Sequence, residues 1–230
     1  MKLKDVCDEI ENVSPAIEYK GQNFTYLDIS SIDNSIHKIV EPKIYEAQNA
    51  PSRARQKIKI GDILLSTVRT YLKNTAPILE AYKFPIASTG FCVLRGKQGI
   101  LESKFLFYKV LSDVFVKKLN SLQRGSSYPA VRNNDVLEQS ILLPPLSFQQ
   151  QIVQTIDKQF ASANQMQKTV NKALSDASKL KQSILKKAFS GGLVSQNPKD
   201  EIIRRAYSAS LPTKPKDEPV NALLEKLKNV

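Results

Sequence analysis

Residues 147–189 read SFQQQIVQTIDKQFASANQMQKTVNKALSDASKLKQSILKKAF, and this stretch decides the fold of the C-terminal part of the chain. It contains neither proline nor glycine, and its apolar residues recur mostly at steps of three and four, which is the period of one helical face. At a rise of ~1.5 Å per residue the helix would be roughly 60 Å long. A helix of this length cannot bury its own apolar stripe, so we expect a second helix to pair with it. The residues expected to make that contact are Ile152, Ile156, Phe160, Val170, Leu174 and Ile184.

The sequence on either side of this stretch predicts where the helix ends. Leu143-Pro144-Pro145-Leu146 precedes it and Gly191-Gly192 follows it, with Ser147 as the predicted N-cap. We therefore expect three parts: a globular domain over 1–146, a spacer helix over 147–190, and a tail over 191–230. In the tail only Val220–Leu227 has helical spacing, which predicts a short terminal helix. An alternative is that the long helix folds back onto its own globular domain.

Residues 1–146 have a different pattern, with short apolar runs separated by Gly, Pro, Asn and Ser. One helix is predicted at Phe105–Leu119. The runs predict strands, which are Ile58–Ile60, Ile63–Leu65, Ile86–Ala87, Phe91–Leu94 and Ile141–Leu143. The mixture indicates an irregular α+β domain rather than a regular βαβ repeat.

The charge of the chain indicates a polyanionic partner. The formal net charge is +12 and the pI is about 9.6, so nucleic acid and an acidic membrane surface are both candidates. Residues 49–73 concentrate this charge, because they carry Arg53, Arg55, Lys57, Lys59, Arg69 and Lys73 against one acid, Asp62. Such focusing favours a phosphate-binding face, although a solvated basic loop is the alternative.

Membrane insertion and secretion are not expected. No run of 18 apolar residues occurs, and acidic residues come too early in MKLKDVCDEI for a signal peptide. We expect a cytoplasmic protein. Cys7 and Cys92 are far apart in sequence and are expected to be reduced core residues, since a zinc site needs clustered ligands.

The sequence also lacks the motifs of enzymes that act on nucleic acid. There is no GxxxxGK[ST] loop, no GxGxxG after a strand, and no Asn/Asp-Pro-Pro-Tyr/Phe tetrapeptide of the kind that grips an extruded adenine. The single histidine, His37, makes a hydrolytic triad implausible. We expect no catalysis, no cofactor and no metal, which leaves a binding module.

Five segments then resemble one family closely, in the same order along the whole chain. Residues 61–69 (GDILLSTVR) and 125–131 (GSSYPAV) are similar to two signatures of the specificity subunits of type I restriction-modification systems. Residues 141–153 resemble the family's proline junction, and residues 180–194 (LKQSILKKAFSGGLV) its conserved helix. Residues 217–225 (DEPVNALLE) resemble its C-terminal segment. Two departures are Phe148 where the family usually has Glu, which puts a capping salt link in doubt, and an extra stretch at 201–214.

The resemblance implies the fold and the partners. Family members carry two target-recognition domains, each of which reads half of a split DNA target, and two conserved helices that pair as an antiparallel coiled coil. They dock adenine methyltransferase subunits and, through these, motor-restriction subunits. With one recognition domain and one helix, this chain resembles a half-length form. We therefore expect double-stranded DNA, the methyltransferase, the restriction subunits and a second half-length chain as partners, and no membrane.

Two groups of residues are the expected DNA contacts. Arg53, Arg55, Lys57, Arg69 and Lys73 lie in the basic segment, and Arg124, Ser126, Ser127, Tyr128 and Arg132 lie around the second turn. Tyr128 has a rival interpretation as a packed residue before Pro129, and Asp62 is expected to stabilise a turn. Two other functions remain open at this point: a complete nucleic-acid enzyme, and a coiled-coil adaptor that does not touch DNA.

Overall fold

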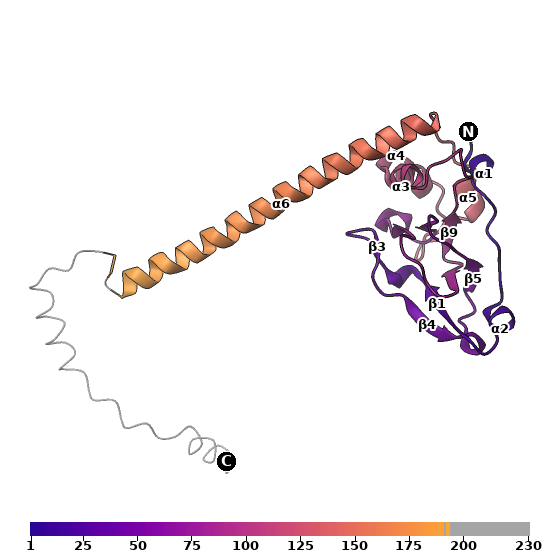
Figure 1. Cartoon of the computed structure of the whole chain (residues 1–230), viewed down its shortest axis with the longest axis horizontal. Coiled ribbons are helices and arrows are strands. Elements are labelled where there is room, and N and C mark those ends of the chain that lie inside the picture. Colours follow the sequence, from indigo (N-terminus) through magenta and orange to yellow (C-terminus); the bar gives the residue numbers. More distant parts are fainter. Residues whose placement is uncertain (191, 194–230) are drawn as a thin grey trace, which may run out of the picture. The chain divides into compact units, whose positions relative to one another are not determined.

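The computed structural model describes residues 1–190, 192 and 193. They fall into two compact units, Met1–Ser162 and a second one that begins at Ala163. The first unit contains small sheets and short helices, and the long helix α6 (Leu146–Phe189) begins in it and continues into the second (Figure 1). The expected fold class, a mixed α+β domain followed by a long C-terminal helix, is thereby confirmed.

The first unit is built on two main sheets. One is mixed and has the order β4-β1-β8-β5, its strands being β1 (Asn23–Leu27), β4 (Lys43–Glu46), β5 (Ala54–Lys57) and β8 (Pro85–Ser88). The other is antiparallel with the order β7-β6-β9, its strands being β6 (Ile63–Ser66), β7 (Thr75–Pro77) and β9 (Phe91–Leu94). A small hairpin pairs β2 (Ile32–Asp33) with β3 (Lys38–Ile39).

The antiparallel sheet is buried on both faces, which explains the uninterrupted apolar runs in β6 and β9. Ile63 and Leu65 belong to one core cluster, in which they pack with α1 (Leu3–Val6), α3 (Ser103–Leu111), α4 (Asp113–Asn120) and α5 (Asn133–Leu137). Leu64 points the other way, into the cluster shared with the mixed sheet. A third cluster covers the outer face of the mixed sheet, near α2 (Pro15–Glu18) and the 3₁₀ turn η2 (Ala47–Asn49).

Three expected elements differ from the structure. Phe105–Leu119 was predicted as one helix, but α3 and α4 are separate. Ser112 lies between them in extended conformation (φ −61°, ψ 142°), and its hydroxyl caps α4 by accepting from the Phe115 amide at 3.4 Å. A cap of this kind stabilises a new helix start, so the apolar spacing continues while the helix does not.

The predicted strands at Ile58–Ile60 and Ile141–Leu143 were wrong. After β5 the chain turns, because the Asp62 carboxylate accepts from the Lys59 amide at 2.8 Å and Gly61 has φ +93°. Residues 141–143 form no strand, although the Ile141 amide donates to the Met1 carbonyl at 2.8 Å. Pro144 and Pro145 follow at once and have no amide proton to extend a ladder.

Helix α6 begins at Leu146, so the prediction of Ser147 as N-cap was wrong: Ser147 lies in the first turn. The amides of Phe148 and Gln149 both donate to the Pro145 carbonyl, at 2.9 and 3.1 Å. At the other end, the Gly192 amide donates to the Lys187 carbonyl at 2.8 Å, the bond that closes a Schellman-type terminus. The expected tail and its terminal helix lie outside the described residues, apart from Gly192 and Leu193.

Of the helices in the described part, not one combines the length and apolarity needed to cross a bilayer. The same part contains no group of three or more His, Cys, Asp or Glu side chains arranged to hold a metal ion.

Candidate nucleic-acid interface

Strand β5 presents two arginines at a sheet edge. Its residues alternate, with Ala54 and Gln56 buried and Arg55 exposed, and Arg53 is exposed immediately before it. The alternation is fixed by Gln56, whose side-chain amide donates to the carbonyls of Ser88 (2.7 Å) and Phe91 (2.9 Å). Because a strand directs successive side chains to opposite faces, Arg53 and Arg55 point outward together. Within the described residues neither forms an ion pair, and the Arg55 Nε donates to the Ser52 carbonyl at 3.0 Å.

Lys57, the third basic residue of this group, is placed differently. Its ammonium pairs with Glu18 at 3.0 Å and with Glu11 at 3.4 Å. The hydrogen bond that Lys57 donates to Glu18 raises the pKa of Lys57. These pairs hold the N-terminal segment against β5, and they compensate the charge that a phosphate would require. Lys57 is therefore a weaker candidate for DNA contact than its two neighbours.

The loop after β6 carries two residues in left-handed conformation. Arg69 (φ 49°, ψ 55°) and Lys73 (φ 52°, ψ 38°) flank the 3₁₀ turn η3 (Thr70–Leu72). The turn is tied to the α4 end, since the Thr70 hydroxyl donates to the Asn120 side chain at 2.6 Å. Lys73 forms an ion pair with Asp113 at 2.7 Å, which lowers the pKa of that carboxyl.

A second loop, residues 124–130, is closed by Arg124 and Ala130. Each donates its amide to the other's carbonyl, at 2.9 and 3.0 Å. Gly125 has φ +90°, and a Cβ there would come within 3.3 Å of the Tyr128 carbonyl oxygen, so the turn needs glycine. The tip consists of exposed side chains, which are Ser126, Ser127 and Tyr128.

Arg69 joins the two loops. Its amide donates to the Pro129 carbonyl at 2.7 Å, and its guanidinium lies 4.9 Å from the centre of the Tyr128 ring. Its Nη2 donates to the Ser127 carbonyl at 3.4 Å, while its buried Nε has no hydrogen-bond partner. Tyr128 is 71% exposed, so it is a surface residue stacked on Arg69 and not a core residue. We refer to Arg69, Ser127, Tyr128 and Pro129 as the arginine–tyrosine clamp.

An acidic side chain also neutralises the charge of a further candidate, Arg124. The Arg124 guanidinium donates to both oxygens of Asp135, at 2.5 and 3.3 Å, which lowers the pKa of Asp135. Asp135 also accepts from the backbone amide of Arg132 at 2.8 Å. The Arg132 side chain is exposed and has no ion pair within the described part of the chain. The candidates without an acidic partner there are Arg53, Arg55, Arg69 and Arg132.

Backbone hydrogen bonds join the chain segments that carry three of these arginines. The Thr89 amide donates to the Arg53 carbonyl (2.9 Å), the Thr67 amide to the Gly90 carbonyl (2.9 Å), and the Val131 amide to the Thr67 carbonyl (2.9 Å). Arg53, Arg69 and Arg132 therefore stand on adjacent segments although they are far apart in sequence. Beside this path a pocket of about 510 Å³ is lined in part by Gln56, Thr89 and Asn133.

Sequence reasoning missed a residue that fixes helix α6. Gln149 is fully buried and makes three hydrogen bonds: its side-chain oxygen accepts from the Glu102 amide, and its nitrogen donates to the carbonyls of Ile100 and Pro144, each at 2.9 Å. The sequence did contain a signal for this role, because the helical period places Gln149 on the same face as the apolar residues of the stripe. One turn further on Val153 is buried, and after two turns Asp157 accepts from Tyr108 (2.5 Å) and Lys104 (2.6 Å).

Asp62 has the structural role expected of it. It is fully buried, and Arg95 donates to both of its oxygens at 2.7 Å. A fully paired buried carboxylate of this kind belongs to the framework and is not available to a ligand.

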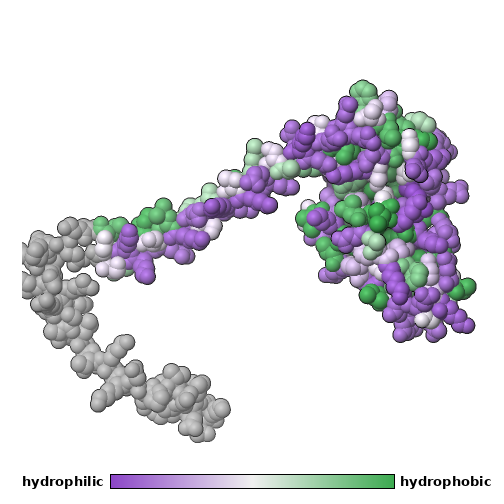
Figure 2. Space-filling view, in the orientation of Figure 1, coloured by the Kyte–Doolittle hydropathy of each residue, from purple (hydrophilic) through white to green (hydrophobic). Residues whose placement is uncertain are grey.

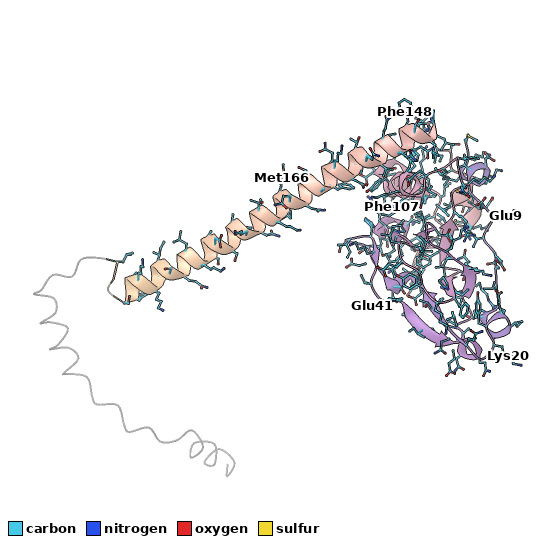
Figure 3. All side chains as sticks on the ribbon, viewed as in Figure 1. Glu9, Lys20, Glu41, Phe107, Phe148 and Met166 are labelled. Carbon is cyan, nitrogen blue, oxygen red and sulfur yellow. The ribbon has the colours of Figure 1, made fainter. Side chains whose placement is uncertain are left out.

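The six seam residues of α6 lie along the helix with different surroundings. Ile156 is half-buried, Ile152 is 39% exposed, and Phe160 meets the Tyr108 ring edge-on at 5.8 Å. Further along the helix the side chains are 45–65% exposed at Val170, Leu174 and Ile184. Figure 2 shows apolar side chains gathered along one side of the helix, and in Figure 3 Met166 projects from it.

Comparison with known proteins identifies the family. Residues 1–176 match the model of the type I restriction modification DNA specificity domain. The chain is 30% identical over 186 residues to the EcoDI specificity subunit of Escherichia coli, covering 79% of this chain and 37% of that protein. It is 36% identical over 114 residues to the EcoKI specificity subunit of E. coli strain K12, covering 48% of this chain and 22% of that one.

Two solved structures are similar as well. The HsdS subunit of Thermoanaerobacter tengcongensis has a TM-score of 0.73 at 39% identity, covering 80% of this chain and 47% of that one. A chain from a study of complex assembly and conformational transition in a type I R-M system has a TM-score of 0.74 at 37% identity, covering 86% and 51%. The chain thus spans about half the length of these structures and about a third of the EcoDI subunit. It belongs to the family of type I restriction-modification DNA specificity subunits.

Proposed function

We propose that this chain recognises one half of a bipartite DNA target and contributes no catalytic step of its own. The observation that carries the proposal is the arginine–tyrosine clamp, in which the two family signatures, 61–69 and 125–131, meet at one exposed surface. Arg53 and Arg132 stand on neighbouring segments without acidic partners in the described residues. A surface with such arginines and an exposed aromatic ring suits a nucleic-acid backbone.

The candidate residues fall into two roles. Arginine donates in a planar fork that fits phosphate oxygens, so Arg53, Arg55 and Arg69 would fix the register of the domain on the duplex. The hydroxyls of Ser126 and Ser127 lie at the loop tip, where they could donate to or accept from base edges in a groove. Lys57, Lys73 and Arg124 would help to hold the loops in shape, because acidic side chains already pair with them.

The chemistry would belong to partner subunits. An adenine methyltransferase must extrude its target base from the duplex before transfer, and the role of this chain would be to place that subunit over the correct adenine. Motor-restriction subunits would join through the methyltransferase. In this scheme residues 1–146 form the recognition domain and residues 147–190 the spacer helix.

A second copy of the chain would supply the other half of the recognition. Two copies related by a two-fold axis and paired through α6 would form an antiparallel coiled coil, with identical recognition domains at its two ends. The DNA target should then consist of two inverted copies of one half-site separated by a fixed spacer.

Sequencing of methylated sites in cells that carry this chain and its cognate methyltransferase tests the proposal. The expected result is one interrupted palindrome that is methylated only when the chain is present. Methylation that does not depend on the chain would overturn the role in recognition. A non-palindromic target in cells that contain no other specificity chain would overturn the self-pairing.

A further inference from the structure

The exposed stripe of α6 follows one strict heptad frame. From Ile156 onward the steps alternate between four and three residues without exception, which is the a/d pattern of a coiled coil. The ten positions are Ile156, Phe160, Ala163, Gln167, Val170, Leu174, Ala177, Lys181, Ile184 and Ala188. The same frame continues backward to Val153 and Gln149, which are buried in the first unit. One stripe therefore begins against the chain's own domain and continues where every described side chain from Ala163 onward is exposed.

A parallel pair of two copies would make a poor seam. In that arrangement each core residue faces its own equivalent. Lys181 would meet Lys181 of the second copy in the core, where like charges repel. Ala163, Ala177 and Ala188 would each face another alanine and leave gaps between the helices.

We propose that two copies pair antiparallel in one specific register, with the two-fold axis at the level of Lys172. This register rests on the self-pairing proposed above. It places each large side chain against a complementary one: Val170 faces Leu174 of the second copy, and Phe160 faces Ile184. It also places both polar core residues against alanine, since Gln167 faces Ala177 and Lys181 faces Ala163. Ile156 faces Ala188 and completes the set.

Shifting either helix by one heptad destroys this match. One shift places Lys181 against Val170 and Gln167 against Ile184 of the second copy. The opposite shift places Lys181 against Ile156 and Gln167 against Val170. Each would bury a charge or an amide between branched apolar side chains, which is costly without a partner.

The positions beside the core support the same register. In an antiparallel pair one flank of each helix faces the equivalent flank of the other, and here that flank carries Met166, Ala173 and Leu180. With the axis at Lys172, Met166 faces Leu180 of the second copy and Ala173 faces its own equivalent. On the other flank Asn171 faces Asn171, and the Gln167 side chain donates to Asn171 at 3.0 Å within one helix. Polar residues at a seam commonly fix register.

The positions of the lysines on α6 and the estimated contact area are both compatible with pairing along the heptad face. Five lysines lie on the opposite side of the helix, where the two copies would keep them apart, namely Lys158, Lys168, Lys172, Lys179 and Lys186. The seam from Ile156 to Ala188 is about 50 Å long at 1.5 Å per residue, and a contact about 10 Å wide covers about 500 Å² per copy. The total of about 1,000 Å² reaches the lower bound of a specific interface.

Crosslinking of the full-length chain tests the register. Single variants Ala173→Cys, Met166→Cys, Leu180→Cys and Lys172→Cys would be treated with a short bifunctional maleimide. The native thiols should not interfere, because Cys7 and Cys92 are buried and burial raises the pKa of both to about 12. Ala173→Cys alone should give at least ten-fold more covalent dimer than Lys172→Cys, which lies on the outer face. Met166→Cys and Leu180→Cys should crosslink efficiently only when the two variants are mixed.

The outcomes separate the register from the pairing. Efficient crosslinking of Ala173→Cys mixed with Met166→Cys, or of Ala173→Cys mixed with Leu180→Cys, in excess of Ala173→Cys alone would indicate a slide of one heptad. Crosslinking of Met166→Cys alone or of Leu180→Cys alone would indicate a slide of two heptads. Either result would overturn the register, while self-pairing would stand. No crosslink in any combination, with a monomer in sedimentation, would overturn the pairing itself. Neither result bears on DNA recognition, which the methylation experiment measures independently.

Discussion

The guanidinium of Arg69 stacks 4.9 Å from the centre of the Tyr128 ring, and this contact orders two loops that are far apart in the sequence. Arg69 occupies the left-handed region at φ 49°, and its buried Nε lacks a hydrogen-bond partner. A non-glycine residue held in that region costs free energy, so the fold maintains a strained, half-buried arginine beside an exposed tyrosine.

We expect Tyr128→Ala to weaken DNA binding about two- to five-fold, because a cation–π contact at an exposed site contributes about 0.5–1 kcal/mol. Tyr128→Phe keeps the ring and should bind like the unchanged chain. Titration of a fluorescent duplex that contains the methylated site measures both. Equal losses in the two variants would mean that the hydroxyl, and not the stacked ring, makes the contact.

The double variant Arg53→Ala with Arg55→Ala should flatten the salt dependence of DNA binding. Each lost phosphate contact lowers the log–log slope by about 0.9, so the pair should lower it by about 1.8. Lys57→Ala removes the same charge from the same strand, but Glu11 and Glu18 already compensate it. Its slope should be unchanged, which makes it the matched control. A slope that falls equally for Lys57→Ala would show that net charge alone determines binding.

Gln149→Leu should lower the free energy of unfolding by about 1–3 kcal/mol, because it leaves the Glu102 amide and the carbonyls of Ile100 and Pro144 without their partner. Gln150→Leu changes an exposed neighbour on the same helix and should stay within about 0.5 kcal/mol. Urea denaturation of both variants provides the comparison. If the two variants proved equally stable, the three bonds could not be what fixes the start of α6.

The N-terminal segment should detach from α5 in acid. Glu138 accepts from Lys2 and from Lys4 at 2.6 Å, and these hydrogen bonds lower the pKa of its carboxyl to about 2. A lowered pKa adds stability above the unfolded value of about 4.5, and this stability is lost as the pH falls toward 2. Glu138→Gln should therefore be less stable than the unchanged chain at pH 7 and equally stable near pH 2. Thermal melts across this range test it, with the exposed Glu41→Gln as control; a difference that persists at pH 2 would rule out the ion pairs as its cause.

The sequence predicted the elements whose burial pattern is local. Strands β6 and β9 are buried at every position, and apolar except at Ser66, because both faces of their sheet are covered, and α6 is one continuous helix of 44 residues. The split at Ser112 escaped prediction because a hydroxyl cap changes the backbone without changing the apolar spacing. The charge pattern located the basic segment but could not show that Asp113 pairs with Lys73, since that partner lies 40 residues away and only the fold brings it close.

The arginine–tyrosine clamp is a clearer example of a contact between distant residues that the sequence does not predict. Both signatures were visible as motifs, and their residues were candidates separately. Their contact depends on the Val131–Thr67 and Arg69–Pro129 backbone bonds, which no periodicity encodes. Tyr128 had two interpretations in the sequence because tyrosine serves equally in cores and at binding surfaces. Its 71% exposure and its position over Arg69 distinguish them.

Pairing through α6 should raise the affinity of the chain for a DNA target with two half-sites. Leu174→Asp introduces a carboxylate at the centre of the proposed seam, opposite Val170 of the second copy, and should convert a dimer into a monomer in sedimentation. Binding to a duplex with one half-site should be unchanged, because the recognition domain is untouched. Binding to a duplex with both half-sites should fall at least ten-fold, since the second domain no longer contributes by effective concentration. Ser175→Asp adds the same charge one residue away from the seam and should retain the dimer. Equal affinity of Leu174→Asp and the unchanged chain for the two-site duplex would show that each recognition domain binds alone and that α6 does not connect them.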